Sequence, residues 1–254
     1  MIPQREDETV DELLNGRLKV IQKAKGYRFS LDALLLAHFI RLRRNESLLD
    51  MGTGSGVIAL ITAMRRPDVR IAGIDIQEEM VEMASRSAAL NSLEERLTFK
   101  AGDIRLIRRI FDSESFDAVV VNPPYRKLHS GRINPRGEKA LARHEVRGTL
   151  RDFLEAASYV LRPGGRIFVI YPIRRMAALI AGMRKTVLEP KRCRIIHSRC
   201  DMEGIFILAE GCKGGGEELE ILPPLFIYRN EGEYTEAMGE IFNELSRLPS
   251  SDDG

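Results

Sequence analysis

The stretch Phe116-Asp117-Ala118-Val119-Val120-Val121-Asn122-Pro123-Pro124-Tyr125 decides the fold of this chain. Its apolar, β-branched run predicts a buried strand. Two prolines end the strand abruptly, because proline has no N–H for the ladder and keeps the preceding residue out of the helical region. The strand therefore presents an amide, a carbonyl group and an aromatic ring at its carboxyl edge, where open parallel sheets bind ligands.

Strand and helix patterns alternate on both sides of this stretch. The sequence predicts further strands at 47–50, 69–75, 97–100 and 166–171, and helices at 57–64, 77–90, 104–111 and 149–161. Strands separated by helices pair in parallel through right-handed crossovers. Three later strands are predicted at 190–198, 205–210 and 219–228, and their turns are too short for helices. The expected fold class is α/β: a doubly wound, Rossmann-like sheet, mostly parallel, with antiparallel strands at the C-terminal edge.

Smaller elements are expected at the two ends of the chain. They are a helix at 10–14 closed by Asn15-Gly16, a strand at 18–21, an amphipathic helix at 31–42 with its leucines on one face, a helix at 233–245 and a frayed tail at 250–254. Ser30 is the expected N-cap of the helix at 31–42. Asp32 is either a first-turn charge favoured by the helix dipole or part of a turn that lies over a ligand.

Composition limits the class of protein. The chain has 254 residues, 44% of them hydrophobic and 30% charged, and a net charge of only +2, so no overall basic field demands nucleic acid. The polar, acidic N-terminus is unlike a secretory signal, and the longest apolar block, 31–40, is shorter than the roughly 20 residues that a membrane span needs. Cys193, Cys200 and Cys212 lack metal-like spacing and predict reduced thiols. The sequence predicts a cytoplasmic protein without a metal site.

A glycine-rich turn, Leu49-Asp50-Met51-Gly52-Thr53-Gly54-Ser55-Gly56, follows the first strand of the alternation. Glycines let the backbone turn sharply and approach a ligand closely. Asp75 ends the next strand and Asp103 follows the third. Each acid taken singly is explained by a turn at a strand end, but three in succession with glycines between them predict a ligand site.

The type of cofactor follows from this spacing. A nicotinamide or flavin nucleotide is the main alternative for any glycine-rich turn. Here the pattern is Asp-x-Gly-x-Gly-x-Gly rather than Gly-x-Gly-x-x-Gly. Three acids also suit a ligand with ammonium, ribose and adenine amine groups and no phosphate. Both features favour S-adenosylmethionine, with S-adenosylhomocysteine as the product.

The residues after the central strand suit methylation of an amino group. An exocyclic amine is a poor nucleophile, because its lone pair is delocalised. The side-chain oxygen of Asn122 and the carbonyl of Pro123 would hold its two N–H groups, and Tyr125 would stack on the planar acceptor. No general base is required, since the proton leaves after the new bond forms. The motif resembles the Asn-Pro-Pro-Tyr motif of amino-group methyltransferases.

The glycine-rich turn and its acids resemble those of class I methyltransferases, and this resemblance implies roles for them. The methionyl end of the cofactor would be held by Asp50, Gly52, Thr53, Gly54 and Gly56. Asp75 would bind the ribose hydroxyls with Ile76 against the adenine, while Asp103 would accept from the adenine amine with Ile104 beside it. Asn122 would contact both cofactor and acceptor. Residues 46–254 would form the methyltransferase domain, and residues 1–45 a helix and strand extension that covers the cofactor site.

The segment after Tyr125 carries a concentration of basic residues. These are Arg126, Lys127, Arg132, Arg136, Lys139, Arg143, Arg147 and Arg151, against Glu138 and Glu145, with His129 and His144 in addition. A basic segment that begins at the reaction centre is what contact with a phosphate backbone requires. The alternatives are a merely solvated loop and a contact with another subunit.

A closer resemblance spans most of the chain. It rests on Gly26-Tyr27-Arg28-Phe29-Ser30-Leu31-Asp32, Asn122-Pro123-Pro124-Tyr125-Arg126, Arg143-His144-Glu145, Pro223-Pro224-Leu225 and Tyr234-Thr235. These stretches are similar to the tRNA1(Val) adenine-37 N6-methyltransferase family. The resemblance implies an RNA partner, a tRNA, whose flipped adenine stacks on Tyr125. Arg126, Arg143 and His144 would then contact the RNA.

Three other functions stay open at this point. Protein glutamine N5-methyltransferases apply the same motif to an amide, although as a family they carry a longer recognition domain than the 45 residues found here. Amino-methyltransferases of ribosomal RNA or DNA are also possible, and the DNA enzymes are disfavoured because no extra base-reading domain is evident. A non-catalytic RNA-binding module with a relic cofactor site would show a damaged glycine turn or lack Asn122, and neither is seen. The exact RNA, the modified position and the oligomeric state stay open.

Overall fold

The computed structural model describes residues 5–25, 30–123 and 148–247. Its strands are β1 (Glu8–Leu13), β2 (Leu18–Lys23), β3 (Ser47–Met51), β4 (Arg70–Asp75), β5 (Leu97–Ala101), β6 (Phe116–Val121), β7 (Leu161–Pro172), β8 (Leu188–His197), β9 (Gly204–Lys213), β10 (Glu220–Ile221), β11 (Leu225–Phe226), β12 (Tyr228–Asn230) and β13 (Glu233–Tyr234). Its helices are α1 (Leu31–Phe39), α2 (Val57–Arg65), α3 (Glu78–Leu90), α5 (Leu150–Val160), α6 (Met176–Lys185) and α7 (Glu236–Ser246), with short 3-10 turns η1 (Ile104–Arg109) and η2 (Ile173–Arg175).

The main sheet confirms the expected α/β class. Its strands lie in the order β10-β8-β9-β7-β6-β3-β4-β5, and β11 also pairs with β8. Strands β5, β4, β3, β6 and β7 pair in parallel, and β9 is antiparallel to both β7 and β8. The chain passes from β3 to β4 on one side and later returns to β6 on the other. The strand order therefore reverses between β3 and β6, and such a switch point is where doubly wound sheets bind ligands.

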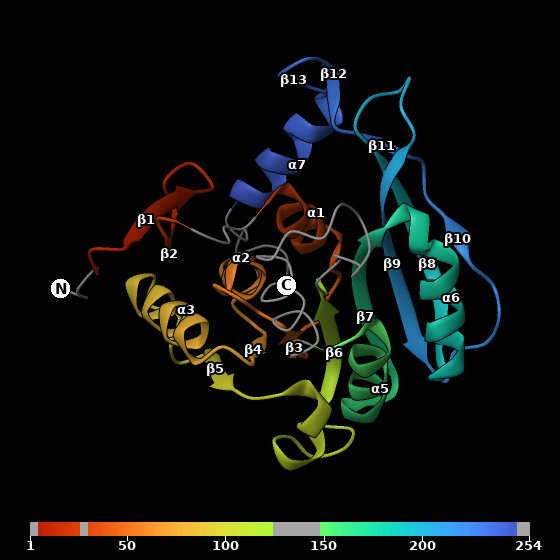
Figure 1. Ribbon diagram of the computed structural model, residues 1–254, viewed down its shortest axis with the longest axis horizontal. Coiled ribbons are helices and arrows are strands. Elements are labelled where there is room, and N and C mark those ends of the chain that lie inside the picture. Colours follow the sequence, from red (N-terminus) through yellow and green to blue (C-terminus); the bar gives the residue numbers. More distant parts are fainter. Residues whose placement is uncertain (1–4, 26–29, 124–147, 248–254) are drawn as a thin grey trace, which may run out of the picture.

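Helices cover both faces of the sheet, so each face has its own core (Figure 1). α1, α2, α3 and α7 cover one face, while α5 and α6 cover the other. Along β6, Ala118 and Val120 enter the first core, and Val119 and Val121 enter the second. This alternation explains why the strand reads as a continuous apolar run.

The N-terminal expectation was partly wrong. Residues 10–14 do not form a helix: β1 pairs with β2 in an antiparallel hairpin, with Leu13 opposite Leu18. Leu14 and Asn15 turn with φ values of +53° and +58°, and Gly16 follows at +79°. The Asn-Gly pair in this turn is a typical hairpin signal.

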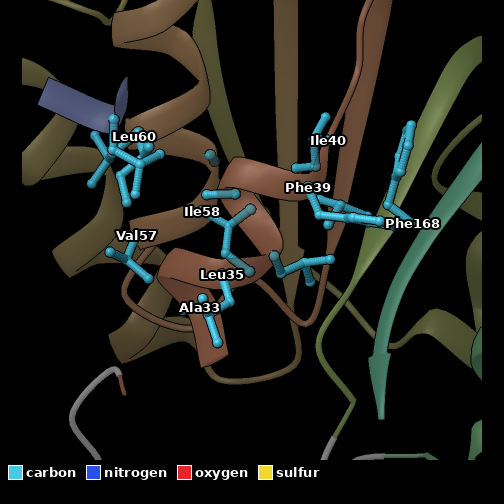
Figure 2. Close-up of a cluster of buried hydrophobic side chains, with 14 of the residues drawn as sticks. Ala33, Leu35, Phe39, Ile40, Val57, Ile58, Leu60 and Phe168 are labelled. Carbon is cyan, nitrogen blue, oxygen red and sulfur yellow. The ribbon is translucent and has the colours of Figure 1, made fainter. Parts of the chain in front are cut away.

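Helix α1 also differs from its expectation. It ends at Phe39 rather than at residue 42, and its leucines are not confined to one face, because consecutive Leu35 and Leu36 are both buried. The helix packs against α2, α7 and β7. Figure 2 shows Leu35 among α2 side chains and Phe39 beside Phe168 of β7, the two rings meeting edge to face at 6.4 Å between centroids.

The C-terminal part holds two further differences. Residues 219–228 do not form one antiparallel strand; they supply the short strands β10 and β11, which pair in parallel with β8. Helix α6, which was not anticipated from the sequence, follows β7 and precedes β8 along the chain. The short helix predicted at 104–111 is the 3-10 turn η1, and β7 begins at Leu161, five residues before the predicted strand. The helix predicted at 233–245 begins at Glu236, after β13. The other predicted strands and helices are confirmed, with small shifts in their ends.

Two general findings complete the fold. None of the helices within the described residues is long and apolar enough to cross a membrane. All three cysteines are free thiols, and burial raises the pKa of the Cys193 thiol.

Candidate active site at the carboxyl edge of the sheet

The ends of β3 and β6 form the centre of the candidate site. Met51, the last residue of β3, is paired with both Ile74 of β4 and Val121 of β6. Gly52 and Asn122 therefore leave the sheet from neighbouring parallel strands, whose axes lie about 5 Å apart. The predicted cofactor turn and the predicted acceptor residue thus begin side by side.

The glycine-rich turn is folded back onto β4. The backbone N–H groups of Gly52 and Thr53 both donate to the carbonyl of Ile74, at 2.8 and 3.0 Å. Gly52, Gly54 and Gly56 have φ values of +72°, +55° and +79°, which side chains disfavour.

Gly56 also lacks room for a side chain. A Cβ there would lie 2.8 Å from the Phe99 ring and 2.9 Å from the Ala84 methyl group. The turn therefore needs glycine at this position for its packing as well as for its backbone.

Asp50 forms a hydrogen bond with this turn through Thr53. Its side chain is buried, and the Thr53 hydroxyl donates to it at 2.7 Å. Burial raises the pKa of Asp50 to about 7, against the opposing effect of hydrogen bonds from Thr53 and from the Ala59 backbone N–H, and the nearby charge of Asp75 raises it further. Asp50 is thus a carboxyl group whose charge is poorly solvated and whose position is fixed by the turn.

Asp75 links the turn to the end of β4. One carboxylate oxygen accepts from the Gly54 N–H at 2.9 Å, and the other accepts from the Gln77 N–H at 2.9 Å. A carboxylate oxygen has two lone pairs, so these bonds leave acceptor capacity for a ligand hydroxyl. Ile76, next in the chain, is half-buried.

Asp103 has a partner that the sequence analysis missed. It caps η1 by accepting from the Arg105 backbone N–H at 2.9 Å, and the Arg105 guanidinium forms an ion pair with it at 2.5 Å. The hydrogen bond from this side chain lowers the pKa of Asp103. The Asp-x-Arg spacing at a strand end was the available signal. Ile104 is buried and packs with Ile107 in the second core.

Asn122 contacts a residue from the N-terminal extension. Its Nδ2 donates to Asp32 Oδ2 at 3.3 Å, although the two residues are 90 positions apart in the sequence. Asp32 is buried and Asn122 half-buried, and Pro123 is buried beside them. The sequence analysis gave Asp32 only a first-turn role or a place near a ligand, and did not foresee this contact.

Several predicted residues lie outside the described part of the chain. They are Tyr125, Arg126, Arg143 and His144, with the stretch 26–29 that was expected near the cofactor. Among the residues that the structure does describe, no group of three or more His, Cys, Asp or Glu side chains is arranged to hold a metal ion.

Curated relatives share the name tRNA1(Val) (adenine(37)-N6)-methyltransferase. One from Porphyromonas gingivalis is 36% identical over 53% of this chain and 52% of its own length, so the chain spans about half of that relative. One from Tolumonas auensis is 28% identical over 75% of this chain and 79% of its own length. One from Pedobacter heparinus is 27% identical over 87% of this chain and 92% of its own length.

Solved structures share the fold of the chain, and a family model identifies the domain. A predicted O-methyltransferase from Agrobacterium tumefaciens has the same fold, with a TM-score of 0.69 and 22% identity over 87% of this chain and 100% of its own. TrmN from Thermus thermophilus matches with a TM-score of 0.51 and 23% identity over 71% of this chain and 48% of its own. A family model described as a methyltransferase domain matches residues 42–222, well over half of the sequence. The chain belongs to this methyltransferase domain family.

Proposed function

We propose that the protein is an S-adenosylmethionine-dependent N6-methyltransferase that acts on an adenine in RNA, in the anticodon loop of a tRNA. The observation that carries the proposal is the position of Asn122 and Pro123 directly after β6, beside the glycine-rich turn after β3. The names of the relatives from three bacterial genera support the choice of tRNA as substrate.

The residues at this edge fit S-adenosylmethionine. Three glycines with positive φ make a turn that a ligand can approach closely. Asp50 and Asp75 form hydrogen bonds with this turn, and Asp103 follows β5, the strand beside β4. These three carboxyl groups match the ammonium, ribose and adenine amine groups of the cofactor, whereas they would repel the phosphates of a dinucleotide. Asp50, Gly52, Thr53, Gly54 and Gly56 would hold the methionyl end, Asp75 and Ile76 the ribose and adenine, Asp103 and Ile104 the adenine amine, and Asn122 would contact the reacting end.

When bound, the cofactor supplies an electrophilic methyl group, whose bond to sulfur breaks with the electron pair left on sulfur. The residues after β6 prepare the acceptor for this transfer. Asn122 Oδ1 and the Pro123 carbonyl would accept the two N6 hydrogens and turn the nitrogen lone pair toward the methyl carbon. Tyr125 would stack on the base, which is worth about 1–3 kcal/mol. The extra proton on nitrogen then leaves to water.

The remaining parts of the chain would serve the proposed function in different ways. We propose that residues 1–45 cover the cofactor site, since Asp32 reaches Asn122. Residues 46–254 would form the methyltransferase domain, and Arg126, Arg143 and His144 would contact the RNA. A protein that modifies tRNA would act in the cytoplasm.

The test is methyl transfer from labelled S-adenosylmethionine into tRNA, ribosomal RNA and protein from a strain that lacks this protein. We expect the label in tRNA, as N6-methyladenosine after nucleoside digestion. Asn122→Ala should lower kcat/KM by about 10²–10³, by analogy with the loss of one preorganised polar contact. Label recovered as N5-methylglutamine would overturn the substrate, and near-normal activity of Asn122→Ala would overturn the mechanism. Cofactor binding without transfer to any acceptor would favour a binding module.

A further inference from the structure

The contact between Asp32 and Asn122 joins two parts of the chain that the family model separates. Asp32 lies in α1, before the matched residues 42–222, while Asn122 directly follows β6 within them. We infer that Asp32 is a positioning residue, which sets the direction of the Asn122 amide so that its oxygen faces the acceptor amine. This inference rests on the proposed function.

The chemistry of the pair gives the amide a single orientation. An ionised carboxylate is an acceptor only, so it bonds to the amide nitrogen of Asn122 and repels the amide oxygen. With Nδ2 directed at Asp32 Oδ2, Oδ1 occupies the other branch of the amide. In the reversed amide, the N–H donors of Asn122 would face the N–H donors of the acceptor amine. Asn122 could then accept no hydrogen bond from that amine.

Asp32 is itself held in place. Its Oδ1 accepts from the Ser30 hydroxyl and from the Ala33 backbone N–H, the latter at 3.0 Å. The N-terminus of α1 favours a negative charge at this position. The helix behind it is anchored by buried side chains, including Ala33, Leu35 and Phe39 (Figure 2). The carboxylate therefore has little freedom to move away from Asn122.

The charge of Asp32 has a second consequence. The acceptor nitrogen gains positive charge as the methyl group arrives, and Asn122 Oδ1 is the group that faces it. A carboxylate bonded to the far side of an amide polarises that amide and makes its oxygen a stronger acceptor. Asp32→Asn keeps the size of the side chain but removes both this charge and the fixed direction of the hydrogen bond.

The experiment compares Asp32→Asn, Asn122→Ala and the double variant, each in the full-length protein. Steady-state kinetics on tRNA from the deletion strain give kcat and KM, and calorimetry gives the Kd of S-adenosylmethionine. Glu236→Gln is the matched control, because Glu236 is an exposed first-turn acid of α7. Circular dichroism melting checks that every variant is folded.

We expect Asp32→Asn to lower kcat by about 10- to 100-fold. This range is taken by analogy from metal sites, where loss of the hydrogen-bond partner that orients a ligating side chain has an effect of this size. KM for tRNA and the cofactor Kd should change by no more than about twofold, and the control should match the wild type. In the Asn122→Ala background, Asp32→Asn should have almost no further effect, because the residue on which it acts is gone. A wild-type kcat, an effect that multiplies that of Asn122→Ala, or a change in cofactor Kd alone would overturn the inference.

A spectroscopic readout keeps the inference separate from the proposed function. The side-chain amide resonances of Asn122, assigned by their absence in Asn122→Ala, should shift in Asp32→Asn and stay unchanged in Glu236→Gln. If the wild type methylates no acceptor, the proposed function fails, and these resonances alone decide the inference. A shift would then uphold the positioning of Asn122 by Asp32, and unchanged resonances would overturn it.

Discussion

Gly56 is the residue whose replacement should damage the glycine-rich turn most. Its φ of +79° costs an L-residue about 1–2 kcal/mol, and a Cβ would press on Phe99 and Ala84 at 2.8 and 2.9 Å. Overpacking of this kind costs about 1–3 kcal/mol. We expect Gly56→Ala to lower the free energy of unfolding by about 2–5 kcal/mol in urea titrations.

Gly232→Ala is the matched control for this prediction. Gly232 has nearly the same φ, +78°, but a Cβ there would meet no atom within 4 Å. It should lose only the backbone cost, about 1–2 kcal/mol. Equal losses in the two variants would show that packing against Phe99 contributes nothing.

Asp50 should make stability fall as pH rises. Burial raises its pKa to about 7, so between its unfolded value near 4 and pH 7 the folded state binds more protons than the unfolded state. The free energy of unfolding therefore decreases across this window, and the loss is complete above pH 7. Relative to wild type, Asp50→Asn should gain about 2–3 kcal/mol between pH 5 and pH 8.

Urea unfolding at several pH values measures this difference, because other groups titrate alike in the two proteins. Asp201→Asn is the control, since Asp201 is an exposed acid whose hydrogen bond with Arg199 lowers its pKa. Its difference from wild type should stay constant from pH 5 to pH 8. A constant difference for Asp50→Asn as well would mean that Asp50 is ionised throughout this range.

Sequence reasoning at this scale found residues whose type is locally required. The glycines and Asp75 follow from strand ends and turn chemistry, and the structure gives them close contacts in the expected turn. Sequence reasoning did not find the hydrogen-bond partners of Asp103 and Asn122. Arg105 is near Asp103 in sequence but reads as one more surface cation, and Asp32 meets Asn122 only because α1 packs against the sheet.

One buried ion pair helps to fix the β1–β2 hairpin to α3, beside the apolar contact of Ile21 with Met80 and Met83. The side chain of Glu8 is fully buried and accepts from two nitrogens of Arg86, one of them at 2.8 Å. The hydrogen bond from Arg86 lowers the pKa of Glu8, so this contribution is present at neutral pH and lost in acid as Glu8 is protonated. In β2, the N–H of Ile21 donates to Ser87 on the same helix at 2.9 Å.

We expect Glu8→Ala to lower the free energy of unfolding by about 2–3 kcal/mol at pH 7, because it leaves a mostly buried cation without its main partner. Hydrogen exchange should speed up in β1 and β2 and stay unchanged in β3. Asp7→Ala is the control, since the Asp7–Lys23 pair is exposed at its acid end and should contribute much less than the Glu8–Arg86 pair. Unchanged exchange in the hairpin would contradict its attachment through Glu8.

Elements were predicted well where the hydrophobic pattern was long, and poorly where pairing decided the outcome. Residues 10–14 contain acids and leucines that favour a helix, but β2 offers a partner strand with Asn15-Gly16 at the turn. Residues 219–228 read as one strand, yet they pair with β8 only at two separate points. Such pairings depend on distant segments, which local patterns do not contain.

At the scale of the whole molecule, the alternation of strands and helices was enough to predict a doubly wound sheet. The order of its strands was not deduced, although it is this order that brings Gly52 beside Asn122. The location of the basic residues likewise matters more than the net charge of the molecule. With a net charge of only +2, the chain has no strong overall field, so the proposed contact with RNA must depend on where its basic residues lie.

The salt dependence of tRNA binding tests whether residues of the basic segment contact the RNA. The basic segment connects Pro123, at the carboxyl edge of the sheet, to Gly148. If Arg126 and Arg143 contact phosphates, the double variant Arg126→Gln/Arg143→Gln should reduce the slope of log Kd against log salt by about 1.4, which is about 0.7 for each single-stranded phosphate contact. Filter binding at a series of salt concentrations gives this slope.

The double variant Arg70→Gln/Lys185→Gln removes the same charge from the opposite edge of the sheet. Arg70 opens β4 and Lys185 ends α6 just before β8, and both side chains are exposed. Because salt screens exposed charges beyond about 10 Å, this variant should leave the slope nearly unchanged. Equal reductions in the two double variants would mean that RNA responds to total charge and not to the basic segment. A reduction confined to Arg126→Gln/Arg143→Gln would instead assign the phosphate contacts to the edge that carries Asn122.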